Sequence, residues 1–168
     1  MNRSSSVSPL VVLGLYVFAA TLVLSPISDL ATTVWPPRFT DLGWRYGFLG
    51  LMAGYLQTPV LGLVLGMATA YWQGQGRGVR ISALLSLLGA VILILAMVTF
   101  ALDVLAMRQV RPEDQRAGVL VGGMLQELKY FGAFLVLALL GLGGQRMAQR
   151  FREKAAHEPS SPGIIRRD

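Results

Sequence analysis

The chain has 168 residues, of which 54% are hydrophobic and only 14% are charged, and its mean hydropathy is +0.55. A soluble domain carries about 25% charged residues, so this composition predicts an integral membrane protein. The net charge of +6 would suggest nucleic acid binding in a soluble protein. Here the basic residues flank apolar runs, so we expect a lipid bilayer as the partner and no nucleic acid.

Four apolar runs are long enough to cross a hydrocarbon core of about 30 Å as helices. None of them alternates polar and apolar residues, which favours helices over a β-barrel. The first run resembles a signal peptide in position, but Asp29 stands where a cleavage site needs a small residue, so we expect it to be retained. We predict membrane helices over approximately residues 9–27, 47–72, 80–107 and 112–150.

These helices predict an all-α fold, a four-transmembrane-helix bundle that forms one domain over residues 1–154. The segment 155–168 lacks apolar periodicity and contains two prolines, so we expect a disordered basic tail. The segment 26–46 is the longest predicted loop. Its aromatic residues Trp35, Phe39, Trp44 and Tyr46 favour an anchor at the membrane interface, with a loop that docks a partner or covers a ligand as the alternative.

The distribution of charge predicts the orientation in the membrane. One side of the predicted bundle carries nine basic residues: Arg3, Arg77, Arg80, Arg146, Arg150, Arg152, Lys154, Arg166 and Arg167. The other side carries five, which five acidic residues balance: Arg38, Arg45, Arg108, Arg111 and Arg116 against Asp29, Asp41, Asp103, Glu113 and Asp114. Because basic loops stay in the cytoplasm, both termini are predicted to be cytoplasmic, in a bacterial inner membrane.

The second predicted helix has small residues at a four-residue spacing, among them Gly50, Gly54, Gly62 and Gly66. Small residues let membrane helices approach closely, so we expect these glycines to lie at helix contacts and the second helix to be the central one. The ridge winds around the helix, so one neighbouring helix cannot use all of it. Contacts with another subunit remain an alternative for part of it. Pro59 predicts a kink in the outer third of this helix.

Five polar residues are predicted to form a layer in the outer third of the bundle: Arg45, Gln57, Asp103, Glu127 and Lys129. Charged residues inside a membrane usually mark functional sites, so this layer is the candidate site. We predict an ion pair between Lys129 and Asp103, and Arg45 or Arg108 as the partner of Glu127. The alternative is that Lys129 reaches the headgroups and that Glu127 is partly hydrated.

The sequence offers little that points to chemistry. It has no cysteine and a single histidine, His157, which excludes thiol chemistry and makes haem or chlorin ligation by this chain very unfavourable. The HExxH, Gly-x-Ser-x-Gly and phosphate-loop motifs are missing, so we expect no enzymatic activity, no cofactor and no metal. The first three spans have no carboxylate near mid-depth, which argues against a proton path.

The sequence leaves two candidate functions open. The first is a non-catalytic accessory, assembly or scaffolding subunit that associates with other membrane subunits or with copies of itself. The alternative is a small-ligand-binding or transporter-like membrane protein whose polar site lies in the outer third of the bundle.

Overall fold

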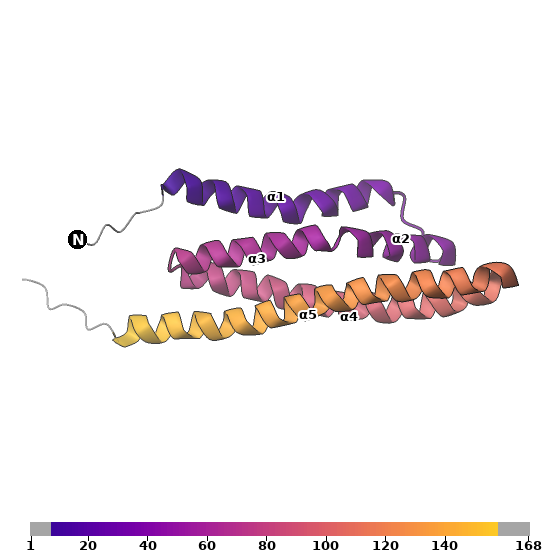
Figure 1. Ribbon diagram of the computed structural model, residues 1–168. Coiled ribbons are helices and arrows are strands. Elements are labelled where there is room, and N and C mark those ends of the chain that lie inside the picture. Colours follow the sequence, from indigo (N-terminus) through magenta and orange to yellow (C-terminus); the bar gives the residue numbers. More distant parts are fainter. Residues whose placement is uncertain (1–7, 158–168) are drawn as a thin grey trace, which may run out of the picture.

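The computed structural model describes residues 8–157 and contains five helices, with no strand in that range (Figure 1). The helices are α1 (Pro9–Thr33), α2 (Leu42–Tyr55), α3 (Gln57–Trp72), α4 (Gly76–Val110) and α5 (Glu113–His157). By length and hydropathy α1, α4 and α5 can each cross a membrane, and α2 and α3 together can form a fourth span bent by 40°. The prediction of an all-helical chain with several apolar helices is confirmed.

The helix predicted over residues 47–72 is divided into α2 and α3, because the chain breaks at Leu56. Pro59 follows three residues later and has no N–H to donate to the carbonyl of Tyr55, so the helical hydrogen-bond ladder loses a rung there. Leu56 keeps helical dihedral angles, and its carbonyl accepts a hydrogen bond of 3.3 Å from the Val60 N–H. The chain therefore changes direction without forming a loop, at the level where the sequence predicts a kink.

The segment between the first two spans is shorter than the predicted loop over residues 26–46. Helix α1 continues through the polar residues up to Thr33, and α2 already begins at Leu42. The start of α2 is set by Asp41, whose carboxylate accepts hydrogen bonds from the N–H groups of Gly43 and Trp44 at 2.8 and 3.2 Å. The apolar run alone did not reveal this cap, so the prediction placed the helix start five residues too late.

Helices α4 and α5 form the longest helix–helix contact and run antiparallel (Figure 1). Three glycines of α5 face α4 so closely that a Cβ would overlap its neighbour. The Cβ would lie 2.7 Å from a Val104 methyl carbon at Gly123, 2.6 Å from Leu87 Cγ at Gly141, and 2.9 Å from Ala83 Cβ at Gly144. Glycine thus permits the close approach of these two helices.

The bent second span is the central element, as predicted, because α2 and α3 together contact all three other helices. Helix α1, in contrast, contacts α2 and α3 but neither α4 nor α5. It crosses α3 at Gly62, where a Cβ would lie 2.7 Å from the carbonyl oxygen of Ala19. The helices therefore do not close into a ring around a common axis, since α1 is attached to one side of the other spans.

The pairing of α4 with α5 places their charged residues at two common levels. The stretch of α4 between Arg80 and Asp103 has no charge and is about 33 Å long at 1.5 Å per residue. The stretch of α5 between Lys129 and Arg146 is about 24 Å long. Because Gly144 lies beside Ala83 and Gly123 beside Val104, the two stretches begin at the same inner level, and the stretch of α5 ends before that of α4. Lys129 therefore lies about five residues, or about 7.5 Å, deeper than Asp103.

The segment predicted as a disordered tail, residues 155–168, lies outside the described residues except for the last three positions of α5. Arg3, Arg166 and Arg167 also lie outside them. Within the described part, α1 begins and α5 ends at the same end of the molecule (Figure 1).

Candidate functional site

The strongest polar interaction of the predicted layer joins α2 to α4. The guanidinium of Arg45 donates to both carboxylate oxygens of Asp103, from Nη2 at 2.6 Å and from Nε at 3.2 Å. Asp103 is only 3% exposed, and the second Nη of Arg45 donates to the carbonyl of Phe39 at 3.3 Å. The predicted pairing of Asp103 with Lys129 is therefore wrong, as is the pairing of Arg45 with Glu127.

Beneath this ion pair an aromatic cluster, Tyr46, Phe100 and Tyr130, joins three helices. Tyr46 stacks on Phe100 with ring centroids 5.5 Å apart, and Phe100 lies 6.0 Å from the ring of Tyr130. Tyr130 is fully buried, and its hydroxyl donates to the carbonyl of Leu49 at 2.6 Å. This cluster was not predicted from the sequence. The signal for it was an aromatic residue with a polar end inside an apolar run, which needs a hydrogen-bond partner when buried.

Glu127 lies on the side of α5 that faces α4. One of its carboxylate oxygens is buried and has no hydrogen-bond partner among the described residues, and the same is true of the side-chain oxygen of Gln126. Glu127 lines an apolar groove of about 530 Å³ between α4 and α5, together with Val104 and Phe131. The arrangement leaves this carboxylate without a cation.

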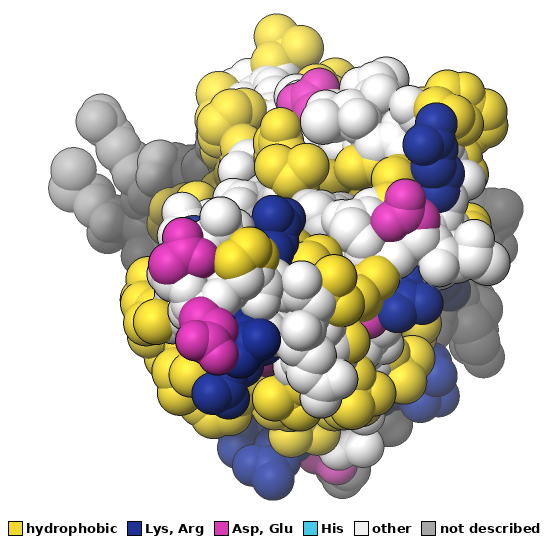
Figure 2. Space-filling view, turned by 90° about the vertical axis from the view of Figure 1, so that its right-hand side faces the viewer, with side chains coloured by type: hydrophobic (Ala, Val, Ile, Leu, Met, Phe, Trp, Pro, Cys, Tyr) yellow, Lys and Arg dark blue, Asp and Glu magenta, His cyan; other side chains and the backbone are white. Residues whose placement is uncertain are grey.

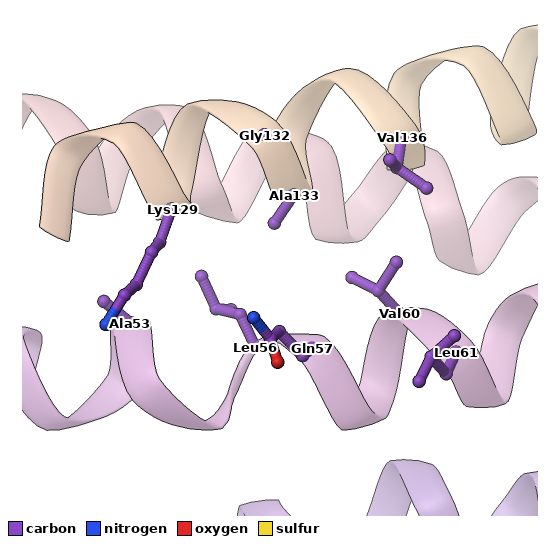
Figure 3. A pocket seen from close by; sticks show the side chains of 9 residues that line it. All are labelled: Ala53, Leu56, Gln57, Val60, Leu61, Lys129, Gly132, Ala133 and Val136. Carbon is purple, nitrogen blue, oxygen red and sulfur yellow. The ribbon is translucent and has the colours of Figure 1, made fainter. Parts of the chain in front are cut away.

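Lys129 projects from another side of α5, because residues two positions apart on a helix point about 200° apart. Its side chain extends toward α2 near Ala53 and shares a groove with Gln57, at the bend between α2 and α3 (Figure 3). The groove has a volume of about 420 Å³ and is otherwise lined by apolar or small residues: Ala53, Leu56, Val60, Leu61, Gly132, Ala133 and Val136. Among the described residues, no ion pair or hydrogen bond engages the ammonium group of Lys129.

The five residues predicted as one site thus occupy three places in the fold. Arg45 and Asp103 form an internal ion pair, and Glu127 lies in the groove between α4 and α5. Lys129 and Gln57 share the groove beside the helix bend. Of the five predicted site residues, the structure therefore brings together two pairs, Arg45 with Asp103 and Lys129 with Gln57. Of these places, only the groove of Lys129 offers a cation and an amide to a molecule outside the chain.

The four glycines predicted to lie at helix contacts fall into two groups. Gly62 lies at the crossing with α1, and the Cβ position of Gly66 is in ordinary contact with Ala19 at 3.8 Å. Nothing lies within 4 Å of the Cβ positions of Gly50 and Gly54, so these two do not pack against the rest of the chain. The four-residue spacing is longer than one helical turn, so the ridge rotates away from the neighbouring helices toward the N-terminal end of the span.

The end of the molecule at which α4 leads into α5 carries both signs of charge. Figure 2 looks onto this end and shows acidic and basic side chains interspersed on it. One pair there is Arg116 with Glu113, 3.6 Å apart in the first turns of α5. In residues 8–157 no group of three His, Cys, Asp or Glu side chains could hold a metal ion.

No family model, no curated protein and no solved structure matches this chain.

Proposed function

We propose that this chain is a small integral protein of a bacterial inner membrane, with four spans and both termini in the cytoplasm. The support is the asymmetry of charge between the two ends of the molecule. At the end where α4 begins and α5 ends, the described residues include six basic side chains and one acidic side chain, Glu153. The basic residues are Arg77, Arg80, Arg146, Arg150, Arg152 and Lys154. At the other end acids balance bases. Basic residues of short loops remain on the cytoplasmic side.

Its role in this proposal is that of a non-catalytic accessory or scaffolding subunit. The observation that carries it is the cleft between α1 and α4, which do not contact each other. The cleft has a volume of about 310 Å³, and its lining contains no charged side chain. It includes Ile27 of α1, Leu88 and Ile92 of α4, and Pro59 at the bend of the second span.

A transmembrane helix of another subunit suits this cleft. Association inside a bilayer depends on close van der Waals contact, and two helices that flank a third offer it contact on two sides. The exposed fractions of Ile27 and Leu88 are 55% and 58%, so their apolar surfaces are available to such a helix. The partner helix would fill the cleft that separates α1 from α4.

The test uses two adjacent positions of α4 at the same membrane depth. Ile92 lines the cleft, whereas Val91 is 56% exposed and lines none of the described cavities. We expect wild-type protein, extracted from its native membrane in mild detergent, to migrate in a particle heavier than the 18.2 kDa chain in its micelle. Ile92→Trp fills the cleft and should release the monomer, whereas Val91→Trp should not. A wild-type monomer, or equal behaviour of the two variants, would contradict the accessory role.

A second candidate function is a membrane protein that binds a small amphiphilic ligand. The observation that favours it is the groove beside the helix bend, where Lys129 extends to the Ala53 end and Gln57 lies midway along an otherwise apolar surface (Figure 3). A transporter-like role has less support, because the ion pair of Arg45 and the ring of Tyr130 fill the space between α2, α4 and α5.

A further inference from the structure

We propose that the groove between the α2–α3 bend and α5 binds one anionic phospholipid, with its phosphate at Lys129 and an acyl chain along the apolar part of the groove. This inference rests on the second candidate function and does not depend on the accessory role. The groove has an open side, which lets a lipid enter laterally from the bilayer.

The charge of the groove selects the headgroup. Lys129 lies inside the level of Asp103, where a cation without a counter-ion is costly. Neither acidic residue of the layer pairs with Lys129, since Asp103 pairs with Arg45 and Glu127 projects from another side of α5. A phosphate oxygen can accept a charge-assisted hydrogen bond from the ammonium group, and the amide of Gln57 can donate a second one.

A net anionic lipid fits better than a zwitterionic one. The groove has one cation and no carboxylate, so the ammonium group of a zwitterionic headgroup would find no charged partner there. Phosphatidylglycerol brings a single negative charge, which neutralises Lys129.

The shape of the groove selects a chain that points toward the middle of the membrane. Ala53, Gly132 and Ala133 have little or no side chain, which leaves the hollow between the helices. Val136 lies two helical turns from Lys129, about 10 Å nearer the bilayer centre. Val60 and Leu61 form the opposite wall at the same end of the groove (Figure 3). A polar outer end and an apolar inner end match the orientation of a lipid in the outer leaflet.

The experiment uses the full-length protein in detergent with added phosphatidylglycerol or phosphatidylcholine, and measures bound lipid by native mass spectrometry. We expect one tightly bound phosphatidylglycerol and a preference over phosphatidylcholine. Lys129→Gln removes the charge and should weaken phosphatidylglycerol binding by about tenfold. Gly132→Leu fills the groove, and since nothing lies within 4 Å of this Cβ position, it should block binding without disturbing the fold.

Two matched variants control for the basic inner end, which also attracts anionic lipid. Lys154→Gln removes a cation there, and Gly143→Leu enlarges another α5 glycine with an open Cβ position. Both should retain the tightly bound lipid. A photoactivatable phosphatidylglycerol should label α5 between Lys129 and Val136 in wild-type protein and lose this label in Gly132→Leu.

Three results would overturn the proposal. The first is equal binding of the two lipids, and the second is a preference that Lys129→Gln leaves unchanged. The third is occupation of the groove by a second copy, seen as a dimer that Gly132→Leu dissociates while no lipid label appears on α5. The lipid preference is measured on the monomer, so a failure to find this preference leaves the accessory role intact. A failure of the accessory role likewise leaves the lipid proposal intact, because Ile92→Trp alters a different cleft.

Discussion

Arg45 and Asp103, 58 positions apart in the chain, are joined by two hydrogen bonds that connect α2 to α4 at the outer end of the helices. Their environments differ, since the side chain of Arg45 is 38% exposed and that of Asp103 only 4%. The guanidinium can therefore turn toward water or headgroups if its partner is removed, whereas the carboxylate cannot leave its site without moving α4.

This asymmetry gives the first prediction. Arg45→Gln should destabilise the protein more than Asp103→Asn, because it leaves a buried carboxylate without its cation, at a cost of about 1–3 kcal/mol. The double variant should be less destabilised than the sum of the single variants, since the unpaired charge disappears with the attraction. Thermal unfolding in detergent measures all three. Additive effects, or a larger effect of Asp103→Asn, would contradict this reading of the pair.

The glycines of the second span give a prediction that separates close contacts from spacing. Gly62→Ala should destabilise the crossing of α1 with α3 by about 1–3 kcal/mol, because the added Cβ would lie 2.7 Å from the Ala19 carbonyl oxygen. Gly54→Ala adds the same group eight residues earlier, where nothing lies within 4 Å, and should not lower stability. Detergent melts of the two variants provide the comparison. Similar destabilisation in both would mean that helix propensity or lipid contact, rather than this crossing, sets the effect.

Tyr130 should contribute through its hydroxyl as well as its ring. Tyr130→Phe keeps the ring against Phe100 but leaves the buried carbonyl of Leu49 without this 2.6 Å hydrogen bond, which should cost about 1 kcal/mol. Tyr46→Phe is the control, because it keeps the stacking on Phe100 and removes a hydroxyl to which no hydrogen bond is assigned. Chemical denaturation in mixed micelles should show a lower midpoint for Tyr130→Phe alone.

The orientation can be read from single cysteines, since the natural chain has none. Thr40 lies in the short connection between α1 and α2, and Gly76 at the start of α4. Thr40→Cys should react with a membrane-impermeant thiol reagent in intact cells, whereas Gly76→Cys should react only after the membrane is opened. The opposite pattern would reverse the proposed topology.

The apolar runs were sufficient to predict the helices, because the length of an uninterrupted hydrophobic segment is a local property. The ends were less predictable. Helix α1 continues past Asp29 to Thr33, and α2 begins at the Asp41 cap, because the helical backbone does not stop where the hydrophobicity stops. The break at Leu56 was only partly foreseen, since Pro59 indicated a kink but the regular glycine spacing suggested a continuous helix.

The contacts between helices were beyond the sequence for a physical reason. Spacing shows which residues share a face but not which neighbour that face meets. Gly50 and Gly62 looked equivalent, yet one is open and the other is at a crossing. Lys129 was the predicted partner of Asp103, yet the position of α2 against α4 brings Arg45 to this carboxylate instead.

Helix α1 is attached to its neighbours at three heights. Near the outer end, the ring N–H of Trp44 donates to the carbonyl of Val34 at 3.1 Å. Midway along the helix, Ala19 packs against Gly62. Near the inner end, the hydroxyl of Tyr16 donates to the side-chain oxygen of Gln75 at 2.8 Å. A single transmembrane helix adapts to a thinner or thicker bilayer by changing its tilt. With three attachments along its length, α1 cannot tilt alone, so a mismatch in hydrophobic thickness must be met by a tilt of α1 and α3 together or by deformation of the surrounding lipid.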